Sequence, residues 1–294
     1  MIWWKKMSTL LLLTGTAALA QQPGAKPVPH HPGGFVEVEG GNLYYEECGS
    51  GPQTVLLVHD GILHSAAWDE VWPEFCKSFH VVRYDRRGFG RSPTAKTWYS
   101  ETDDVLAVLR KVGVKQAVVV GSSHGGELSL NFTLEHPDHV QQLVLVGAVV
   151  TGMPYSDYFF DRGNKNSEPM EKKDVQGMLK NWAYDQYLIA PDHPQAKKKL
   201  LDLLTASPQD MTHEDWARPT RSAVERLAEI KVPTLILVGD ADIADVLIHA
   251  GAIEAGIPQS RLMVIHDAGH LMYLEKPDEF TQTVIQFILR NSAW

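Results

Sequence analysis

The chain has 294 residues, a formal net charge of −9 at neutral pH and two cysteines. Its length suits one domain that carries an insertion better than two independent domains. The acidic balance, with a pI near 5.8, leaves no basic footprint for nucleic acid or for an anionic membrane surface. We therefore expect a small, neutral molecule as the partner and no nucleic acid.

The first 20 residues have the pattern of a targeting segment. Lys5 and Lys6 precede the leucine run 10–13, and the small residues around Ala20 form a cleavage site. The apolar run is well short of the ~20 residues that a membrane span needs. We predict a signal peptide over residues 1–20, cleaved near Ala20, and a mature protein exported to the periplasm or the extracellular space. An uncleaved anchor is the alternative, and no stable membrane span is expected later in the chain.

Residues 21–33 are rich in proline and glycine and are predicted to form a linker. After them, Gly40-Gly41 separates the β-prone segments 35–39 and 43–45. This spacing is typical of a hairpin, so the first two strands should be antiparallel.

Six short apolar runs then follow without a clean alternation of polar and apolar residues. They are residues 55–58, 81–84, 118–120, 143–146, 235–238 and 262–265. Such runs are typical of strands covered on both faces. Helical patterns lie between them, most clearly over 103–112 and 126–136, and a closing helix carries Phe280, Val284, Phe287 and Ile288. The alternation of strand and helix predicts an α/β fold with a mostly parallel sheet.

Residues 151–218 interrupt this alternation. They contain no strand-like run, and Val175, Met178, Leu179 and Trp182 recur at helical spacing. We predict a small helical cap insertion over 151–218, between the two parts of the core, 34–150 and 219–294.

Cys48 and Cys76 could form a disulfide in an exported chain. However, Cys48 falls at the end of a predicted strand and Cys76 in a predicted helix. We expect two separate buried thiols and keep the disulfide as the alternative.

The most informative motif is Gly121-Ser122-Ser123-His124-Gly125, which follows an apolar strand and opens a helix. A serine hydroxyl is a weak nucleophile, so an enzyme holds it on a tight turn beside a base and near backbone N–H donors. Small residues two positions before and after the serine permit such a turn. Only Ser123 has glycine at both positions, so Ser123 is the candidate nucleophile.

A serine nucleophile also needs a histidine base and a carboxylate that orients the base. Carboxylates follow the strand 235–238 at Asp240, Asp242 and Asp245, and histidines follow the strand 262–265 at His266 and His270. Catalytic groups commonly lie at the carboxyl ends of parallel strands. The three carboxylates and the two histidines are therefore all candidates to lie near the serine.

These landmarks resemble the α/β-hydrolase superfamily from Gly34 to Trp294. The resemblance rests on His59-Asp60-Gly61, on Asp85 to Ser92, on the serine turn, on Gly239 to Asp242 and on Gly269-His270. It implies an eight-stranded sheet with helices on both faces, with Asp242 as the triad acid and His270 as the base. The family usually places the acid three residues after the glycine, which favours Asp242, and His266 lacks the preceding glycine of His270.

The resemblance also assigns an oxyanion hole to the backbone N–H groups of Gly61 and His124. Asp60 replaces the glycine that is usual in this loop. We expect its side chain to turn away from the hole and to cap local N–H groups. The side chain of His124 is expected to pack behind the turn, with substrate contact as the alternative. The arginines of the 85–92 segment are expected to stabilise a turn.

In the insertion, seven apolar and aromatic side chains could cover Ser123: Tyr155, Tyr158, Phe159, Phe160, Met178, Trp182 and Tyr187. Of these we expect Tyr155, Phe159 and Trp182 to contact the substrate and most of the others to pack against one another.

The sequence thus predicts an exported, carboxylesterase-like serine hydrolase that cleaves a small ester or lactone through an acyl-enzyme. No cofactor and no metal is implied, because the sequence has neither a ligand cluster nor a phosphate-binding glycine loop. Hydrolysis of amide or carbon–carbon bonds, cofactor-free perhydrolase activity and a ligand-binding receptor stay open as alternatives, as does the oligomeric state.

Overall fold

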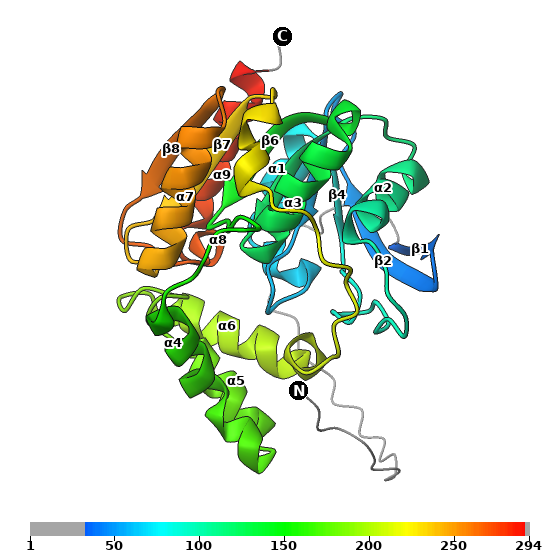
Figure 1. Ribbon diagram of the computed structural model, residues 1–294. Coiled ribbons are helices and arrows are strands. Elements are labelled where there is room, and N and C mark those ends of the chain that lie inside the picture. The colour runs from blue at the N-terminus through cyan, green and yellow to red at the C-terminus, as the bar shows by residue number, and fades with distance from the viewer. Residues whose placement is uncertain (1–32, 292–294) are drawn as a thin grey trace, which may run out of the picture.

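A computed structural model describes residues 33–291 of the chain. The predicted signal peptide and the linker up to residue 32 lie outside the described residues. The centre of the fold is one eight-stranded sheet (Figure 1). Its strands are β1 (Gly34–Val38), β2 (Gly41–Cys48), β3 (Thr54–Val58), β4 (His80–Tyr84), β5 (Ala117–Ser122), β6 (Val140–Val146), β7 (Thr234–Gly239) and β8 (Ser260–Ile265). They are ordered β1-β2-β4-β3-β5-β6-β7-β8.

Strand β2 alone runs against its neighbours, because it pairs antiparallel with both β1 and β4. From β4 to β8 every pair is parallel. The hairpin turns at Gly40, whose φ of +72° favours glycine, and Val38 pairs with Gly41. The predictions of the hairpin and of a mostly parallel eight-stranded sheet are therefore confirmed.

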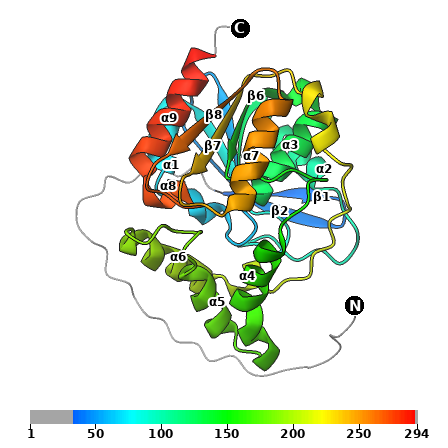
Figure 2. The same cartoon turned by 60° about the vertical axis from the view of Figure 1, so that its left-hand side comes forward.

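The helices cover both faces of the sheet, as predicted (Figures 1 and 2). One face carries α1 (Trp72–Ser78), α8 (Met272–Glu275) and α9 (Pro277–Arg290), and the other carries α2 (Glu101–Lys111), α3 (His124–Glu135) and α7 (Ala244–Gly256). Alternate strand residues supply the two cores: Val55 and Leu57 pack in the first, and Leu56 and Val58 in the second. All four are fully buried, which explains why the strand runs show no polar alternation.

Helices α4 (Asp157–Ser167), α5 (Val175–Ala183) and α6 (Pro194–Ala206) lie together beyond one end of the sheet (Figures 1 and 2). The Ser156 and Asp174 side chains cap the N-termini of α4 and α5. In the part of the chain that the structure describes, five 3-10 helices complete the fold: Ser65–Trp68, Pro137–His139, Glu168–Lys172, Pro208–Met211 and Val224–Glu229. Within residues 33–291, no helix is long and apolar enough to cross a membrane.

The expectation of two separate thiols is wrong, because Cys48 and Cys76 form a disulfide. Cys48 ends β2, Cys76 lies in α1, and their Cα atoms are 5.5 Å apart. Helix α1 packs on β4, which is the neighbour of β2 in the sheet. This crossing of strand order brings the two cysteines together, and a linear view of the sequence does not reveal it.

Loss of the disulfide should destabilise the fold. The bond closes a loop with a sequence separation of 28 residues, which corresponds to roughly 3–4 kcal/mol of chain entropy. We expect the double variant Cys48→Ala/Cys76→Ala to melt several degrees below the wild type. A reducing agent should lower the melting temperature of the wild type but not that of the variant. Equal melting temperatures for both proteins without reductant would contradict the expected contribution.

Candidate active site

Ser123 lies at the sharp turn between β5 and α3. Its φ of +53° is in the left-handed region, which a serine rarely adopts. The Ser123 N–H donates to the Val146 carbonyl of β6 at 2.8 Å, and the Ser123 carbonyl accepts from the N–H groups of Gly126 and Glu127. These backbone bonds hold the serine in a conformation that its own preference opposes.

The two glycines of the turn are required by close packing. A Cβ atom on Gly121 would lie 2.3 Å from the Gly125 carbonyl oxygen, and one on Gly125 would lie 2.2 Å from the His59 carbonyl oxygen. Both distances are far below van der Waals contact. The spacing of the motif thus follows from the approach of α3 to the β3 end of the sheet.

His270 and Asp242 meet in the loops that follow β8 and β7. His270 Nδ1 is 2.7 Å from Asp242 Oδ2, and both side chains are almost completely buried. Burial alone would lower the pKa of His270. The charge and hydrogen bond of Asp242, with a further contribution from the charge of Asp60, outweigh burial and raise this pKa above its ordinary 6.5.

The other carboxylates and histidine considered from the sequence have different partners. Asp240 lies 3.0 Å from His266, whose side chain is 85% exposed. Asp245 accepts hydrogen bonds from the backbone N–H and the hydroxyl of Ser156 at the start of α4. Neither carboxylate contacts His270, so Asp242 is the one that can orient this histidine.

A cavity of about 230 Å³ joins these groups. Its lining includes Ser123, Asp242 and His270, the predicted oxyanion residues Gly61 and His124, and the predicted contact residues Tyr155, Phe159 and Trp182. The rest of the lining is Asp60, Ile62, Glu127, Val149, Arg162, Leu188, Ile243 and Val246. The sequence-predicted site residues therefore surround one space, although they come from distant parts of the chain.

The N–H groups of Gly61 and His124 have no acceptor within the described residues. His124 is the first residue of α3, where helix N–H groups lack intrahelical partners and the helix dipole favours negative charge. Both groups are thus available to a negatively charged oxygen in the cavity.

The prediction that Asp60 caps local N–H groups is confirmed. Asp60 Oδ1 accepts the N–H groups of Ile62 at 2.7 Å and Leu63 at 2.9 Å. The side chains of two arginines bond to other segments and not within the 85–92 turn, since Arg86 donates to the Asp60 carbonyl and Arg91 to the Tyr44 hydroxyl of β2.

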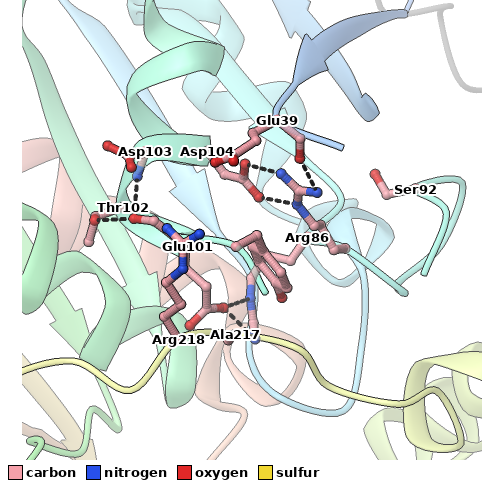
Figure 3. Close-up of polar contacts among 12 residues, drawn as sticks. Glu39, Arg86, Ser92, Glu101, Thr102, Asp103, Asp104, Ala217 and Arg218 are labelled. Atoms are coloured by element: carbon pink, nitrogen blue, oxygen red, sulfur yellow. Dashed lines mark hydrogen bonds and ion pairs between the residues drawn. The ribbon is translucent and has the colours of Figure 1, made fainter. Parts of the chain in front are cut away.

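The expectation that the His124 side chain packs behind the turn is wrong. The side chain is 36% exposed, lines the cavity and lies between two carboxylates, 3.2 Å from Glu101 and 3.5 Å from Glu127. Glu101 also pairs with Arg86 in the polar cluster of Figure 3. Burial would raise the pKa of Glu101, but the charges of His124 and Arg86 lower it to about 2. His124 thus faces charged partners that its local sequence did not reveal.

Three aromatic side chains of the insertion reach the cavity as expected. Tyr155 stacks on Phe159 with ring centroids 4.3 Å apart, and Trp182 lines the same space from α5. Tyr158 and Phe160 are more than half exposed, whereas Met178 is buried in the core that includes α1, α8 and α9. The insertion therefore supplies an aromatic wall of the cavity.

Glu275, which no motif of the sequence marks, connects the His270 loop to the insertion. Its carboxylate accepts the N–H groups of Gly269 at 2.8 Å and Ala190 at 2.7 Å. Beside it, the N–H groups of His270 and Leu271 donate to the carbonyls of residues 187 and 188. No local motif predicts these contacts, because they join segments about 80 residues apart.

Within residues 33–291, no group of three or more His, Cys, Asp or Glu side chains could hold a metal ion.

The fold and this site identify the class of protein. A model of the alpha/beta hydrolase family matches residues 55–283, which is most of the chain. The chain belongs to the alpha/beta hydrolase family.

Several characterised relatives are hydrolases. The chain is 26% identical over 261 residues to a 2-hydroxy-6-oxo-6-phenylhexa-2,4-dienoate hydrolase of Comamonas testosteroni, covering 84% of this chain and 91% of the relative. Among solved structures it resembles Est816, described as an N-acyl homoserine lactone degrading enzyme, with 25% identity and a TM-score of 0.70 over 86% of this chain and 100% of the other. It also resembles an esterase of Exiguobacterium antarcticum, with 25% identity and a TM-score of 0.73 over 87% and 99% of the two chains.

Removal of the Glu275 carboxylate should weaken both the fold and the site. Glu275→Ala leaves two partly buried N–H groups without their acceptor, at a cost of about 1–3 kcal/mol each. We expect a lower melting temperature and a kcat reduced by about tenfold, because the His270 loop loses an anchor. Glu275→Gln keeps one acceptor oxygen and should fall between Glu275→Ala and the wild type. Wild-type kcat in Glu275→Ala would show that the loop is held without this carboxylate.

Proposed function

We propose that this protein is an exported serine hydrolase that cleaves a small, mainly apolar ester or lactone. Ser123 is the nucleophile, His270 the base and Asp242 the carboxylate that orients it. The observation that carries the proposal is the 2.7 Å contact of His270 with Asp242 in the cavity that Ser123 also lines.

The reaction follows from these roles. His270 Nε2 takes the hydroxyl proton of Ser123 as the serine oxygen attacks the substrate carbonyl carbon. The resulting oxyanion accepts hydrogen bonds from the N–H groups of Gly61 and His124. The imidazolium then returns the proton to the leaving alcohol oxygen as the ester bond breaks, and an acyl-enzyme remains. His270 then deprotonates a water molecule, which attacks the acyl carbon. The imidazolium returns this proton to the Ser123 oxygen as the bond to the acyl group breaks, which releases the acid and restores the enzyme.

The lining of the cavity favours a neutral substrate. Among the described residues that line it, Arg162 alone carries a permanent positive charge. Its Nε and Nη2 atoms donate to the Asp185 carboxylate at 2.7 and 2.9 Å, so Asp185 balances its charge. A substrate carboxylate would compete with Asp185 for this guanidinium, whereas an uncharged acyl chain can pack on Ile62, Leu188 and the aromatic wall. The relatives that degrade a lactone or are esterases support the same substrate class.

Two observations support export. The leader-like pattern of residues 1–20 is one, and the disulfide between Cys48 and Cys76 is the other, since disulfides persist in oxidising compartments.

A panel of activated esters with increasing acyl length, together with simple lactones, tests the activity. We expect Ser123→Ala to lose roughly 10⁴-fold or more of kcat on every hydrolysed substrate. Ser122→Ala is the matched control: its hydroxyl is fully buried next to the nucleophile, and its loss should leave kcat within a few-fold of the wild type. Undiminished hydrolysis by Ser123→Ala would refute the mechanism. The acyl length with the highest kcat/KM would show how long a chain the cavity accepts.

The pH profile of kcat/KM tests His270 as the base. Only the neutral imidazole can accept the serine proton, so activity should be lost as pH falls through the raised pKa of His270, above 6.5. Asp242→Asn removes the charge that favours the imidazolium, so its acid limb should move to lower pH while kcat falls steeply. A wild-type profile that stays flat well below pH 6 would contradict the assignment.

A further inference from the structure

Asp60 makes more polar contacts than its place in a loop requires. The side chain is almost fully buried, and besides the two loop N–H groups its Oδ2 accepts the Tyr273 hydroxyl at 2.8 Å. Its carbonyl accepts from His59 Nδ1 and from the Arg86 guanidinium, both at 2.9 Å. Five hydrogen bonds therefore hold the residue that immediately precedes Gly61.

Tyr273 brings the second loop into this arrangement. It lies in α8, three residues after His270, and its ring packs on Trp68 and Phe280 in the core. Burial, with the neighbouring charge of Asp60, raises the pKa of Tyr273 well above its ordinary 10, so the hydroxyl stays protonated and donates. Asp60 thus connects the loop of Gly61 to the loop of His270, across 213 residues of sequence.

Three donors point at the carboxyl group of Asp60, which matches a carboxylate as their acceptor. Of the charged groups around His270, Asp242 and Asp60 favour the imidazolium most strongly and Arg162 of α4 opposes it. His270 therefore has two carboxylates acting on it, although only Asp242 touches its ring.

We propose that Asp60 is a positioning residue that holds the Gly61 loop and the His270 loop in register through its contacts with Ile62, Leu63 and Tyr273. In this position its charge also favours the protonated form of His270. The proposal rests on the proposed function for the role of His270, and it explains how a carboxylate can replace glycine in this loop. Its oxygens are occupied by the Ile62, Leu63 and Tyr273 donors, which reduce its repulsion of an oxyanion at Gly61.

Two substitutions separate the charge from the contacts. Asp60→Asn keeps the shape and removes the charge, so the acid limb of kcat/KM should move to lower pH by roughly one unit. Tyr273→Phe keeps the charge and removes one hydrogen bond, so its acid limb should stay or move to higher pH. Tyr273→Phe should also lower kcat at the pH plateau by about tenfold, because the two loops lose their connection, whereas Asp60→Asn retains the loop contacts and should lower it less.

Asp202→Asn is the matched control, because it neutralises an exposed carboxylate of α6 that pairs with Lys198, away from both loops. Its acid limb and kcat should equal those of the wild type. An acid limb of Asp60→Asn at the wild-type position would overturn the electrostatic part of the proposal, and a wild-type kcat in Tyr273→Phe would overturn the positioning part.

Titration of the His270 ring by NMR gives a readout that needs no turnover. The midpoint should fall in Asp60→Asn relative to the wild type even if no substrate has been found. An unchanged midpoint overturns the inference, whereas an active Ser123→Ala enzyme would refute the proposed function and leave this shift intact. If Asp60→Asn does not fold, a lower midpoint in Tyr273→Phe, which retains the charge, would equally contradict the proposal.

Discussion

The hydrogen bond between Asp242 and His270 depends on the parallel pairing of β7 and β8, because parallel strands end at the same edge of the sheet. The same geometry places Ser123 at the end of β5 and Gly61 in the loop after β3. The short segments that follow β3, β5, β7 and β8 thus all reach one cavity. This arrangement strains the backbone at one residue. Ser123 adopts a left-handed conformation, which the hydrogen bond to Val146 and the close approach of α3 enforce.

Features that depend on residues close together in the sequence were predictable from it. Gly121 and Gly125 mark the turn because the packing that excludes a Cβ atom acts at fixed spacing from Ser123. The strands were equally predictable, because burial on both faces removes the alternation of polar and apolar residues. Contacts between distant segments were not: Cys48 meets Cys76 only because β4 lies beside β2, and His124 faces Glu101 only once α2 and α3 pack together. The capping role of Asp60 was local and predictable, but its bond to Tyr273 was not.

The insertion is connected to the core more firmly than a separate lid would be. Backbone N–H groups of His270 and Leu271 donate to carbonyls of the insertion, and Glu275 accepts from both sides of this contact. Arg162 of α4 bonds to Asp185, which in turn accepts the N–H of Tyr187. Helix α4, which carries Phe159 of the aromatic wall, is thus bonded through Arg162 and Asp185 to the segment whose Tyr187 carbonyl accepts the His270 N–H.

The disulfide encloses more than a surface loop. The chain between Cys48 and Cys76 contains β3 and the whole segment from His59 to Leu63. Gly61, one of the two proposed oxyanion donors, is therefore part of a covalently closed ring. In a reducing compartment this ring is open, and only non-covalent packing restrains its ends. For the exported enzyme that we propose, oxidation of Cys48 and Cys76 would be a maturation step, because the covalent ring would close only in the oxidising compartment.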